Sequence, residues 1–284
     1  MHVLKPPSCS HAGPQSVRSA KIVVTMRFSR LRRFELKAVT GEERGGSLTG
    51  MTKLKTPSPF WCLNNVNLFE RLAPNQMDAL HRRVKTIRYQ RGETIFLPGD
   101  PSDFVYFLHH GRVKLSYLDE SGKRFMLTIC KQGELFGEMA MLGERQRRLI
   151  AEALEDVEVC IIASRDLTDF MAEHSDLALR ISKTIGARVA TLENRLEDMV
   201  FNSVPTRLAR LLVRLSDEYG VPMEQGVWLD IRLTHRDLAD LIGSTRETTT
   251  LTINQLAAQG LVGKLQGRLL LHDVNQLRHL AKLD

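Results

Sequence analysis

Short runs of alternating apolar and polar residues fill the middle of the chain and predict β-strands. These runs occupy residues 94–97, 104–108, 113–117, 125–129 and 155–162. The segments between them hold turn-forming residues, in PGDP at 98–101, HG at 110–111 and DESG at 119–122. Many short strands at this spacing predict an all-β barrel or sandwich between residues 84 and 162.

From residue 176 to 201 the apolar positions follow a helical period. One set recurs every seven residues, and a second set falls four positions after two of its members, which makes a two-position apolar seam. The first set is Ala178, Ile185, Leu192 and Met199, and the second is Val189 and Leu196. Such a seam predicts a helix that pairs two copies of the chain through Ile185, Val189, Leu192, Leu196 and Met199. The alternative is a helix packed only on its own strand domain, but charged residues flank the seam and favour pairing.

Residues 234–262, THRDLADLIGSTRETTTLTINQLAAQGLV, contain two short helical patterns joined by a glycine. Thr234 with Asp237 matches a capping box, and Ser244 with Glu247 repeats that pattern directly after Gly243. This arrangement predicts a helix-turn-helix, and Ser203 with Pro205 marks the start of a further helix before it, so residues 201–205 are the predicted hinge.

The second of these helices is predicted to expose its N-terminal end to DNA. Ile253, Leu256 and Ala257 would face inward. The candidate contacts to bases and phosphates are Thr234, Ser244, Thr245, Arg246, Glu247, Thr249 and Thr250. The same geometry also occurs in ordinary helical domains. However, LVGKLQGRLLLHD at 261–273 predicts a hairpin wing around Gln266 and Gly267, which favours a winged helix that binds double-stranded DNA.

Composition changes this picture in one respect. The net charge of +7 is uneven, because residues 1–50 hold nine Lys or Arg against three acids and the rest of the chain holds 31 against 30. DNA binding must therefore be argued from local arrangement. The leader, residues 1–55, lacks periodicity and is expected to be disordered. It is either a basic tail that adds nonspecific phosphate contacts, or the result of a misassigned start with Met51 as the true one.

Several classes of protein do not fit the sequence. No apolar run approaches the roughly 18 residues that span a bilayer, so we expect a cytoplasmic protein without a membrane partner. We find no nucleophile elbow, P-loop or HExxH motif, so an enzyme is not expected. The four cysteines have no metal-type spacing, and no metal site is predicted.

Three motifs, in order, resemble the cyclic-AMP receptor protein and FNR (Crp-Fnr) family of bacterial transcription regulators. They are RGETIFLPGDPSDFVYFLHHGRVKL at 91–115, GELFGEMAMLGERQRR at 133–148 and GSTRET at 243–248, and the resemblance covers residues 66–273. It implies an α+β protein with an N-terminal cyclic-nucleotide-binding-like β-roll (jelly roll, 56–174), a long dimerisation helix (175–201) and a C-terminal winged helix-turn-helix (202–284). It also implies a homodimer on an inverted-repeat operator, with RNA polymerase as a further partner.

The resemblance assigns Gly137, Glu138 and Arg148 to a cassette that binds a small nucleotide effector. A glycine admits an anion to backbone amides, an arginine pairs with phosphate, and the glutamate would accept from a ribose hydroxyl. Leu149 stands where a small hydroxyl residue is expected, and Glu193 would bring a carboxylate near the base, so cyclic AMP is disfavoured. Another small ligand, no ligand, or an internal Glu138–Arg148 ion pair remain open.

The same resemblance bears on base recognition. Arg246 matches an arginine that reads guanine and Glu247 a glutamate that accepts from cytosine, whereas Leu251 stands where a further arginine is expected. We therefore expect an altered preference at one base pair. Two other functions stay open. One is an effector-independent or architectural DNA-binding protein, and the other is a haem or redox sensor that uses Cys62, Cys130, Cys160, His109 or His110.

Overall fold

The computed structural model describes residues 67–70 and 72–283, so the predicted leader and Cys62 lie outside the described part. Its first half begins with η1 (Asn67–Phe69) and α2 (Pro74–His81). The strands that follow are β1 (Val84–Tyr89), β2 (Thr94–Phe96), β3 (Phe104–His110), β4 (Val113–Leu118), β5 (Arg124–Cys130), β6 (Leu135–Phe136), β7 (Ile150–Ala153) and β8 (Val157–Ala163), with η2 (Glu138–Leu142) between β6 and β7.

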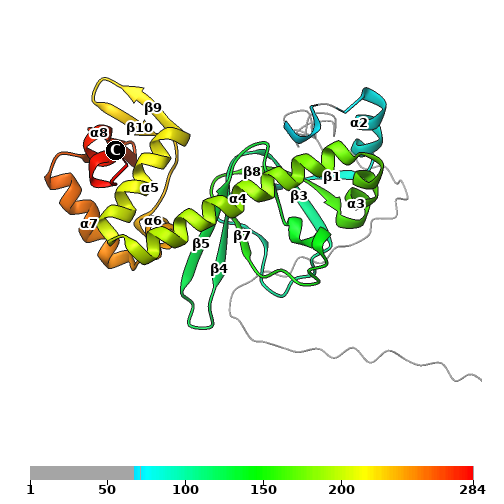
Figure 1. Cartoon of the computed structure of the whole chain (residues 1–284), viewed down its shortest axis with the longest axis horizontal. Coiled ribbons are helices and arrows are strands. Elements are labelled where there is room, and N and C mark those ends of the chain that lie inside the picture. The colour runs from blue at the N-terminus through cyan, green and yellow to red at the C-terminus, as the bar shows by residue number, and fades with distance from the viewer. Residues whose placement is uncertain (1–66, 71, 284) are drawn as a thin grey trace, which may run out of the picture. The chain divides into compact units, whose positions relative to one another are not determined.

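These strands form two antiparallel four-stranded sheets, in the orders β1-β8-β3-β6 and β2-β7-β4-β5 (Figure 1). The predicted sandwich is confirmed. Alternate residues of β3 enter different cores: Val105 and Phe107 face the helices, whereas Tyr106 and Leu108 face the second sheet. Because both faces of β3 are covered, its sequence is a continuous apolar run instead of a strict alternation.

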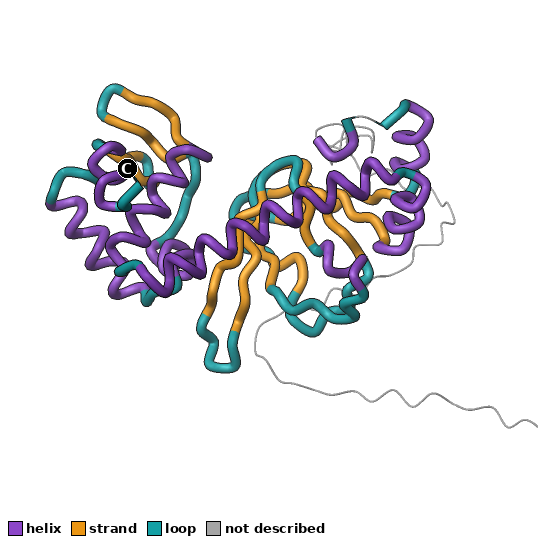
Figure 2. The backbone as a smooth tube through the Cα atoms, viewed as in Figure 1, coloured by secondary structure: helices purple, strands orange, loops and turns teal. Residues whose placement is uncertain are grey.

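Two helices follow the roll, α3 (Ser164–Glu173) and α4 (Ser175–Phe201). The long helix α4 runs beside the strands of the roll (Figure 2). Its first turns pack on the roll through Leu177 and Ile181, which are 2% exposed. Helix α4 ends at the predicted hinge, where Asn202 has an extended backbone.

The second half is a winged helix-turn-helix. It contains α5 (Val204–Tyr219), β9 (Gly220–Met223), β10 (Gly226–Leu229), α6 (His235–Ile242), α7 (Arg246–Ala258), β11 (Val262–Leu265), β12 (Arg268–Leu271) and α8 (Val274–Leu280). The strands pair in the order β11-β12-β10-β9. The predicted wing is confirmed as β11 and β12, joined by Gln266 and Gly267 at φ 52° and 76°. The hairpin of β9 and β10 was not predicted.

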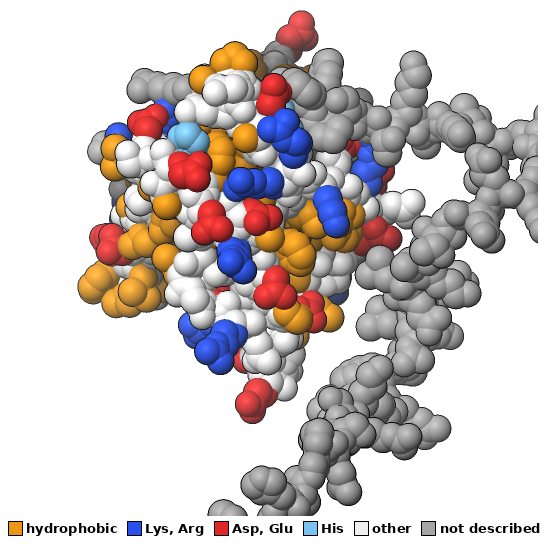
Figure 3. Space-filling view, turned by 90° about the vertical axis from the view of Figure 1, so that its right-hand side faces the viewer, with side chains coloured by type: hydrophobic (Ala, Val, Ile, Leu, Met, Phe, Trp, Pro, Cys, Tyr) orange, Lys and Arg blue, Asp and Glu red, His pale blue; other side chains and the backbone are white. Residues whose placement is uncertain are grey.

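Charge is mixed over the end of the roll that carries α2 and α3. Lysine and arginine side chains alternate there with aspartate and glutamate, and the described residues form no field of one sign on this face (Figure 3). This agrees with the near balance of charge after residue 50. The described part of this face therefore has no basic patch of the kind that binds nucleic acid through the phosphate backbone.

Candidate nucleic-acid interface

Helix α6 begins with the predicted capping box. The Asp237 amide donates to Thr234 Oγ1 at 3.1 Å, and the Thr234 amide donates to Asp237 Oδ2 at 2.9 Å. Gly243 ends the helix at φ 63°, in the left-handed region that favours glycine. A Cβ at this position would stand 3.1 Å from Met199 Cε, so Gly243 also admits the end of α4. The turn between α6 and α7 is therefore fixed on both sides.

Helix α7 is capped differently from the prediction. Thr245 is the N-cap, and its Oγ1 accepts from the Thr248 amide at 3.2 Å. A capping box between Ser244 and Glu247 is therefore wrong, because the helix starts one residue later than that box requires. As a result, Arg246 and Glu247 are both exposed in the first turn of α7.

Most of the candidate DNA contacts have exposed or half-buried side chains, as the sequence predicted. Thr234 and Thr245 are exposed like Arg246 and Glu247, and Ser244 and Thr250 are half-buried.

Thr249 is a correction, because it is 0% exposed and lies on the same side of α7 as the buried Thr252, Ile253 and Leu256. The helical period brings these positions together, so Thr249 packs inward. Ala257, expected to face inward, is exposed.

Thr250 is held by two protein groups. Its hydroxyl donates to the Arg246 carbonyl at 2.8 Å, and its Oγ1 lies 3.0 Å from His235 Nδ1. Because the hydroxyl proton is used on the carbonyl, we assign Nδ1 as the donor to Thr250. Burial, followed by Lys264 and Arg246, lowers the pKa of His235, which favours this neutral ring. The next residue, Leu251, projects into solvent with 64% of its surface exposed.

In the roll, the predicted effector cassette contains a buried arginine, but it is Arg147. Its guanidinium donates to the Gly137 carbonyl at 3.0 Å and to the Phe104 carbonyl, and lies 4.6 Å from the ring centroid of Phe96. Gly137 has φ 73°, and a Cβ there would stand 2.8 Å from Arg147 Nη1, so the glycine is required. Arg148, the residue that the resemblance assigned to phosphate, is exposed.

Glu138 pairs with a residue of α4. Arg188 Nη1 lies 3.2 Å from Glu138 Oε2, and only 19% and 16% of the two side chains are exposed. Arg188 also donates to the Leu135 carbonyl, and its Nη2 lies 3.7 Å from Cys130 Sγ. An internal ion pair thus occupies the cassette, with Arg188 in the place that the sequence analysis gave to Arg148. Leu149 is half-buried against the roll core and Glu193 is exposed.

The two halves of the predicted α4 seam face different surroundings. Ile185 packs on the roll, Leu192 is half-buried, and Met199 contacts the turn after α6. Val189 and Leu196 are 49% and 64% exposed. They share their exposure with Leu179, Val200 and Phe201, at 55%, 65% and 78%. We call Leu179, Val189, Leu196 and Val200 the α4 stripe.

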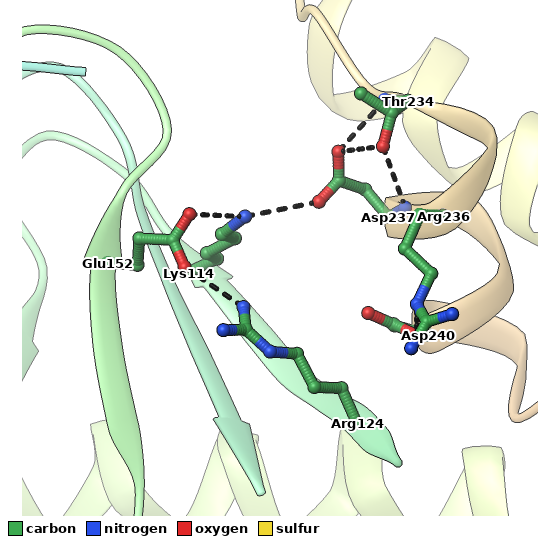
Figure 4. Close-up of polar contacts among 7 residues, drawn as sticks. All are labelled: Lys114, Arg124, Glu152, Thr234, Arg236, Asp237 and Asp240. Carbon is green, nitrogen blue, oxygen red and sulfur yellow. Dashed lines mark hydrogen bonds and ion pairs between the residues drawn. The ribbon is translucent and has the colours of Figure 1, made fainter. Parts of the chain in front are cut away.

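An ion-pair cluster links the second sheet to α6 (Figure 4). Lys114 Nζ of β4 lies 2.8 Å from Glu152 Oε1 and 3.3 Å from Oδ1 of Asp237, the capping residue of α6. Arg124 Nη1 also pairs with Glu152, at 2.9 Å. Nearby, burial raises the pKa of Asp240, although Arg236 Nε approaches it at 3.3 Å. The carboxylate of the α6 capping box is therefore also held by the roll.

Of the residues proposed for a haem or redox site, Cys62 lies outside the described residues. Within residues 67–70 and 72–283, no group of three or more His, Cys, Asp or Glu side chains is placed to hold a metal ion. Burial raises the pKa of the Cys130 thiol to about 12, so it stays protonated at neutral pH. Cys160 lies in the interior of β8, and His109 and His110 end β3. No helix in the described part of the chain is long and apolar enough to cross a membrane.

Comparison with known proteins agrees with this architecture. Residues 86–174 match the family model of the cyclic nucleotide-binding domain, and residues 206–280 match that of the Crp-like helix-turn-helix domain. The chain is 30% identical over 187 residues to a global nitrogen regulator of Synechocystis sp., covering 65% of this chain and 83% of the relative. It is 25% identical to a CRP-like cAMP-activated global transcriptional regulator of Mycobacterium tuberculosis, covering 78% and 98%.

Solved structures show the same fold. A CRP/FNR-family transcriptional regulator from Thermus thermophilus is 30% identical and superposes with a TM-score of 0.56, covering 70% of this chain and 98% of that one. A c-di-GMP-responsive global regulator from Xanthomonas campestris gives a TM-score of 0.64 at 24% identity, covering 71% and 100%. The second likeness bears on the fold alone.

Proposed function

Because the chain belongs to the CRP/FNR family of transcription regulators, we propose that it acts in the cytoplasm as a homodimer that binds an inverted-repeat operator. Members of this family are transcription regulators and not enzymes. We further propose that RNA polymerase is its partner at the promoter, and that the β-roll modulates DNA binding.

The exposed first turn of α7 is the observation that carries the DNA-binding proposal. Among the described residues, the side chains of Arg246 and Glu247 have no hydrogen-bond or ion-pair partner. A DNA base could therefore bind them without displacing a protein group. The Arg246 guanidinium fits O6 and N7 of guanine, and the Glu247 carboxylate fits the amino group of cytosine. Thr234, Ser244 and Thr245 lie at the N-terminal ends of α6 and α7, where hydroxyls and amides suit phosphate.

The α4 stripe supports the dimer. Val189 and Leu196 are seven residues apart and share one heptad position, whereas Leu179 and Val200 are 21 residues apart and share the other, with Gly186 and Glu193 between them. A single chain leaves these side chains in water, and pairing with the same stripe of a second copy would bury them. Phe201 extends the stripe to the hinge, so the contact between copies would reach the DNA-binding half.

An effector that binds in the cassette of the roll must displace or rearrange the Arg188–Glu138 ion pair. A ligand at Gly137 and Glu138 would compete with a guanidinium that α4 already supplies, which links the pocket to the dimer helix. Leu149 and Glu193 disfavour cyclic AMP in this place. The occupied cassette also favours a second candidate function, a regulator of the same fold that binds its operator without an effector.

Selection of bound DNA from a random pool tests the proposal. The full chain is incubated at stated salt, with and without cyclic AMP and a panel of small nucleotides. An inverted repeat that sharpens with one compound supports a gated regulator, and one that is equal in all conditions supports the effector-independent form. Absence of any enriched sequence, with every compound, contradicts sequence-specific binding. In the same assay Arg246→Ala should cost roughly 1–3 kcal/mol on the selected site and much less on random DNA.

A further inference from the structure

A cavity of about 410 Å³ lies where the end of α4 meets α5 and α6. It is separate from the cassette of the roll. Four arginines line it, against two carboxylates, which leaves a net charge of +2. The arginines are Arg195, Arg207, Arg210 and Arg214, and the acids are Glu197 and Asp198. None of the four arginines is exposed: Arg195 is buried and the others are half-buried.

Two of the arginines already donate hydrogen bonds to acceptors of the protein. Arg210 donates to Asp198 Oδ1 at 2.6 Å and to the Ala281 carbonyl at 2.7 Å. Arg195 donates to the Met126 carbonyl at 2.8 Å and to two further carbonyls, but to no carboxylate among the described residues. Burial, followed by the charge of Arg214, lowers the pKa of Arg195 to about 10. Positive charges are therefore crowded in this cavity.

The side chains of Arg207 and Arg214 have no acceptor in the part of the chain that the structure describes. Neither the Arg207 nor the Arg214 guanidinium makes a hydrogen bond or ion pair within residues 67–70 and 72–283, and the Nε of Arg207 is buried without an acceptor there. The buried Nε of Arg207 is unfavourable, since it has lost water without gaining a replacement, whereas the half-buried Arg214 guanidinium only lacks a protein acceptor among the described residues. An anion between these side chains would supply what both of them lack.

We propose that this cavity binds a small ligand that carries a phosphate group. Arg207 and Arg214 would hold its oxygens through charge-assisted, bidentate hydrogen bonds, while Arg210 stays with Asp198. The volume lies within the range of small-molecule sites, and Leu211, Ile242 and Leu283 give the rest of the ligand an apolar wall. Since α4, α5 and α6 all contribute, occupancy ties the dimer helix to the helix-turn-helix.

Calorimetric titration of the full chain, without DNA, tests the site. The probes are inorganic phosphate, pyrophosphate and adenosine monophosphate, with sodium chloride added to keep ionic strength constant. We expect saturable binding of at least one phosphate probe and a loss of about tenfold or more in affinity in the variant R207Q/R214Q. The variant R82Q/R165Q removes the same charge from exposed positions outside the cavity and should bind like the unaltered chain.

Thermal melting of the same variants shows whether a loss of binding comes from misfolding. The two guanidinium groups have no acceptor to lose among the described residues, so R207Q/R214Q should melt at the temperature of the unaltered chain or higher when no ligand is present. Unchanged binding in R207Q/R214Q, or no binding of any probe by the unaltered chain, overturns the proposal. In a separate anisotropy titration with duplex DNA, a variant that keeps its affinity for the phosphate probes but loses affinity for DNA of any sequence also overturns it, because the arginines would then contact the DNA backbone. None of these readings requires the operator proposal to hold.

Discussion

Leu251 is the residue through which we expect the chain to set a base preference without a hydrogen bond. It projects from α7 one turn beyond Glu247, with 64% of its surface exposed, and the hydroxyl of the neighbouring Thr250 is used within the protein. An isobutyl group on a surface that enters the major groove can contact the 5-methyl group of thymine. We therefore propose a contact between Leu251 and a thymine methyl group as the source of the altered preference that is expected where the family has an arginine.

We predict that one thymine of the selected half-site loses its advantage when its methyl group is removed. Deoxyuridine is substituted for each thymine in turn, and affinity is measured by fluorescence anisotropy for the unaltered chain and for Leu251→Ala. At one position the substitution should weaken the unaltered chain by roughly 1 kcal/mol, the value of one buried methyl group, and leave L251A unaffected. Equal losses in both proteins at every thymine would exclude a methyl contact by Leu251.

Asp240 gives a prediction about pH. Burial, together with Asp237, raises its pKa, so the folded protein binds the proton more tightly than the unfolded chain does. Its contribution to stability is therefore complete below the ordinary pKa of 3.8 and is lost as the pH rises through the raised value. Asp240→Asn should accordingly melt higher than the unaltered chain at pH 7, and the difference should shrink towards pH 4.

The control is Asp217→Asn, which removes a carboxylate that is 56% exposed and paired with Arg278. It should show no such gain at pH 7. A D240N variant that melts lower than the unaltered chain at every pH would mean that the ion pair with Arg236 outweighs the cost of burying the carboxylate.

The sequence could not decide which arginine of the effector cassette is buried. The cassette has two consecutive arginines in an extended segment, and successive side chains of such a segment point to opposite sides. The motif predicts that one guanidinium faces inward, but packing against Phe96 and the carbonyls of Gly137 and Phe104 selects Arg147. Nothing in the local sequence separates Arg147 from Arg148, or indicates that Arg188, 50 residues beyond Glu138, completes the pair.

For the helices and strands, the spacing of apolar residues could be predicted from the sequence, but the face of a helix that stays exposed could not. The boundaries of α4 and of the wing follow directly from heptad spacing, glycine and alternation. However, α4 carries two overlapping apolar seams, and only the packing of Ile185 and Met199 on their own chain leaves the α4 stripe as the exposed one. The strands β9 and β10 are four residues each and include Pro222, so only the ladder with β12 identifies them.

The α4 stripe should determine whether the chain is a dimer. Leu196→Glu places a charge where two copies would meet, and we expect it to shift the protein from dimer to monomer in size-exclusion chromatography with light scattering. Leu251→Glu is the matched control, because Leu251 is equally exposed, at 64%, but lies on α7. It should stay dimeric. If L196E and L251E keep the same mass as the unaltered chain, the stripe does not pair two copies.

The contact between β4 and α6 should stabilise the chain. Lys114 lies between Glu152 and Asp237, and the three side chains are 13%, 18% and 9% exposed. Lys114→Met would leave the two carboxylates facing each other without the ammonium. We expect the free energy of unfolding in urea to fall by about 2 kcal/mol. Lys131→Met, at an exposed site without such a pair among the described residues, should change it little, and a K114M variant as stable as K131M would show that the cluster contributes nothing net.

We expect the long helix α4 and the winged helix together to set the spacing between the two DNA half-sites as well as the affinity for each. If two copies join along α4, their α7 helices reach successive major grooves about 34 Å apart, and the distance is set by protein and not by a flexible linker. The hinge between α4 and α5 is short, since only Asn202 and Ser203 separate the two helices. The dimer should therefore tolerate little change in the spacing of its half-sites.

We predict that inserting about five base pairs, half a DNA turn, between the selected half-sites reduces the affinity of the unaltered chain to that of a single half-site. The inserted half turn moves the second half-site to the opposite side of the duplex, where the second α7 cannot follow. Insertion of about ten base pairs restores the side but doubles the distance, so it should not recover affinity. The monomeric L196E variant is the control, because it should bind all three duplexes equally and weakly. Anisotropy titrations at one salt concentration measure this, and an unaltered chain that binds the five-base-pair insertion as tightly as the original operator would contradict a rigid dimer held by α4.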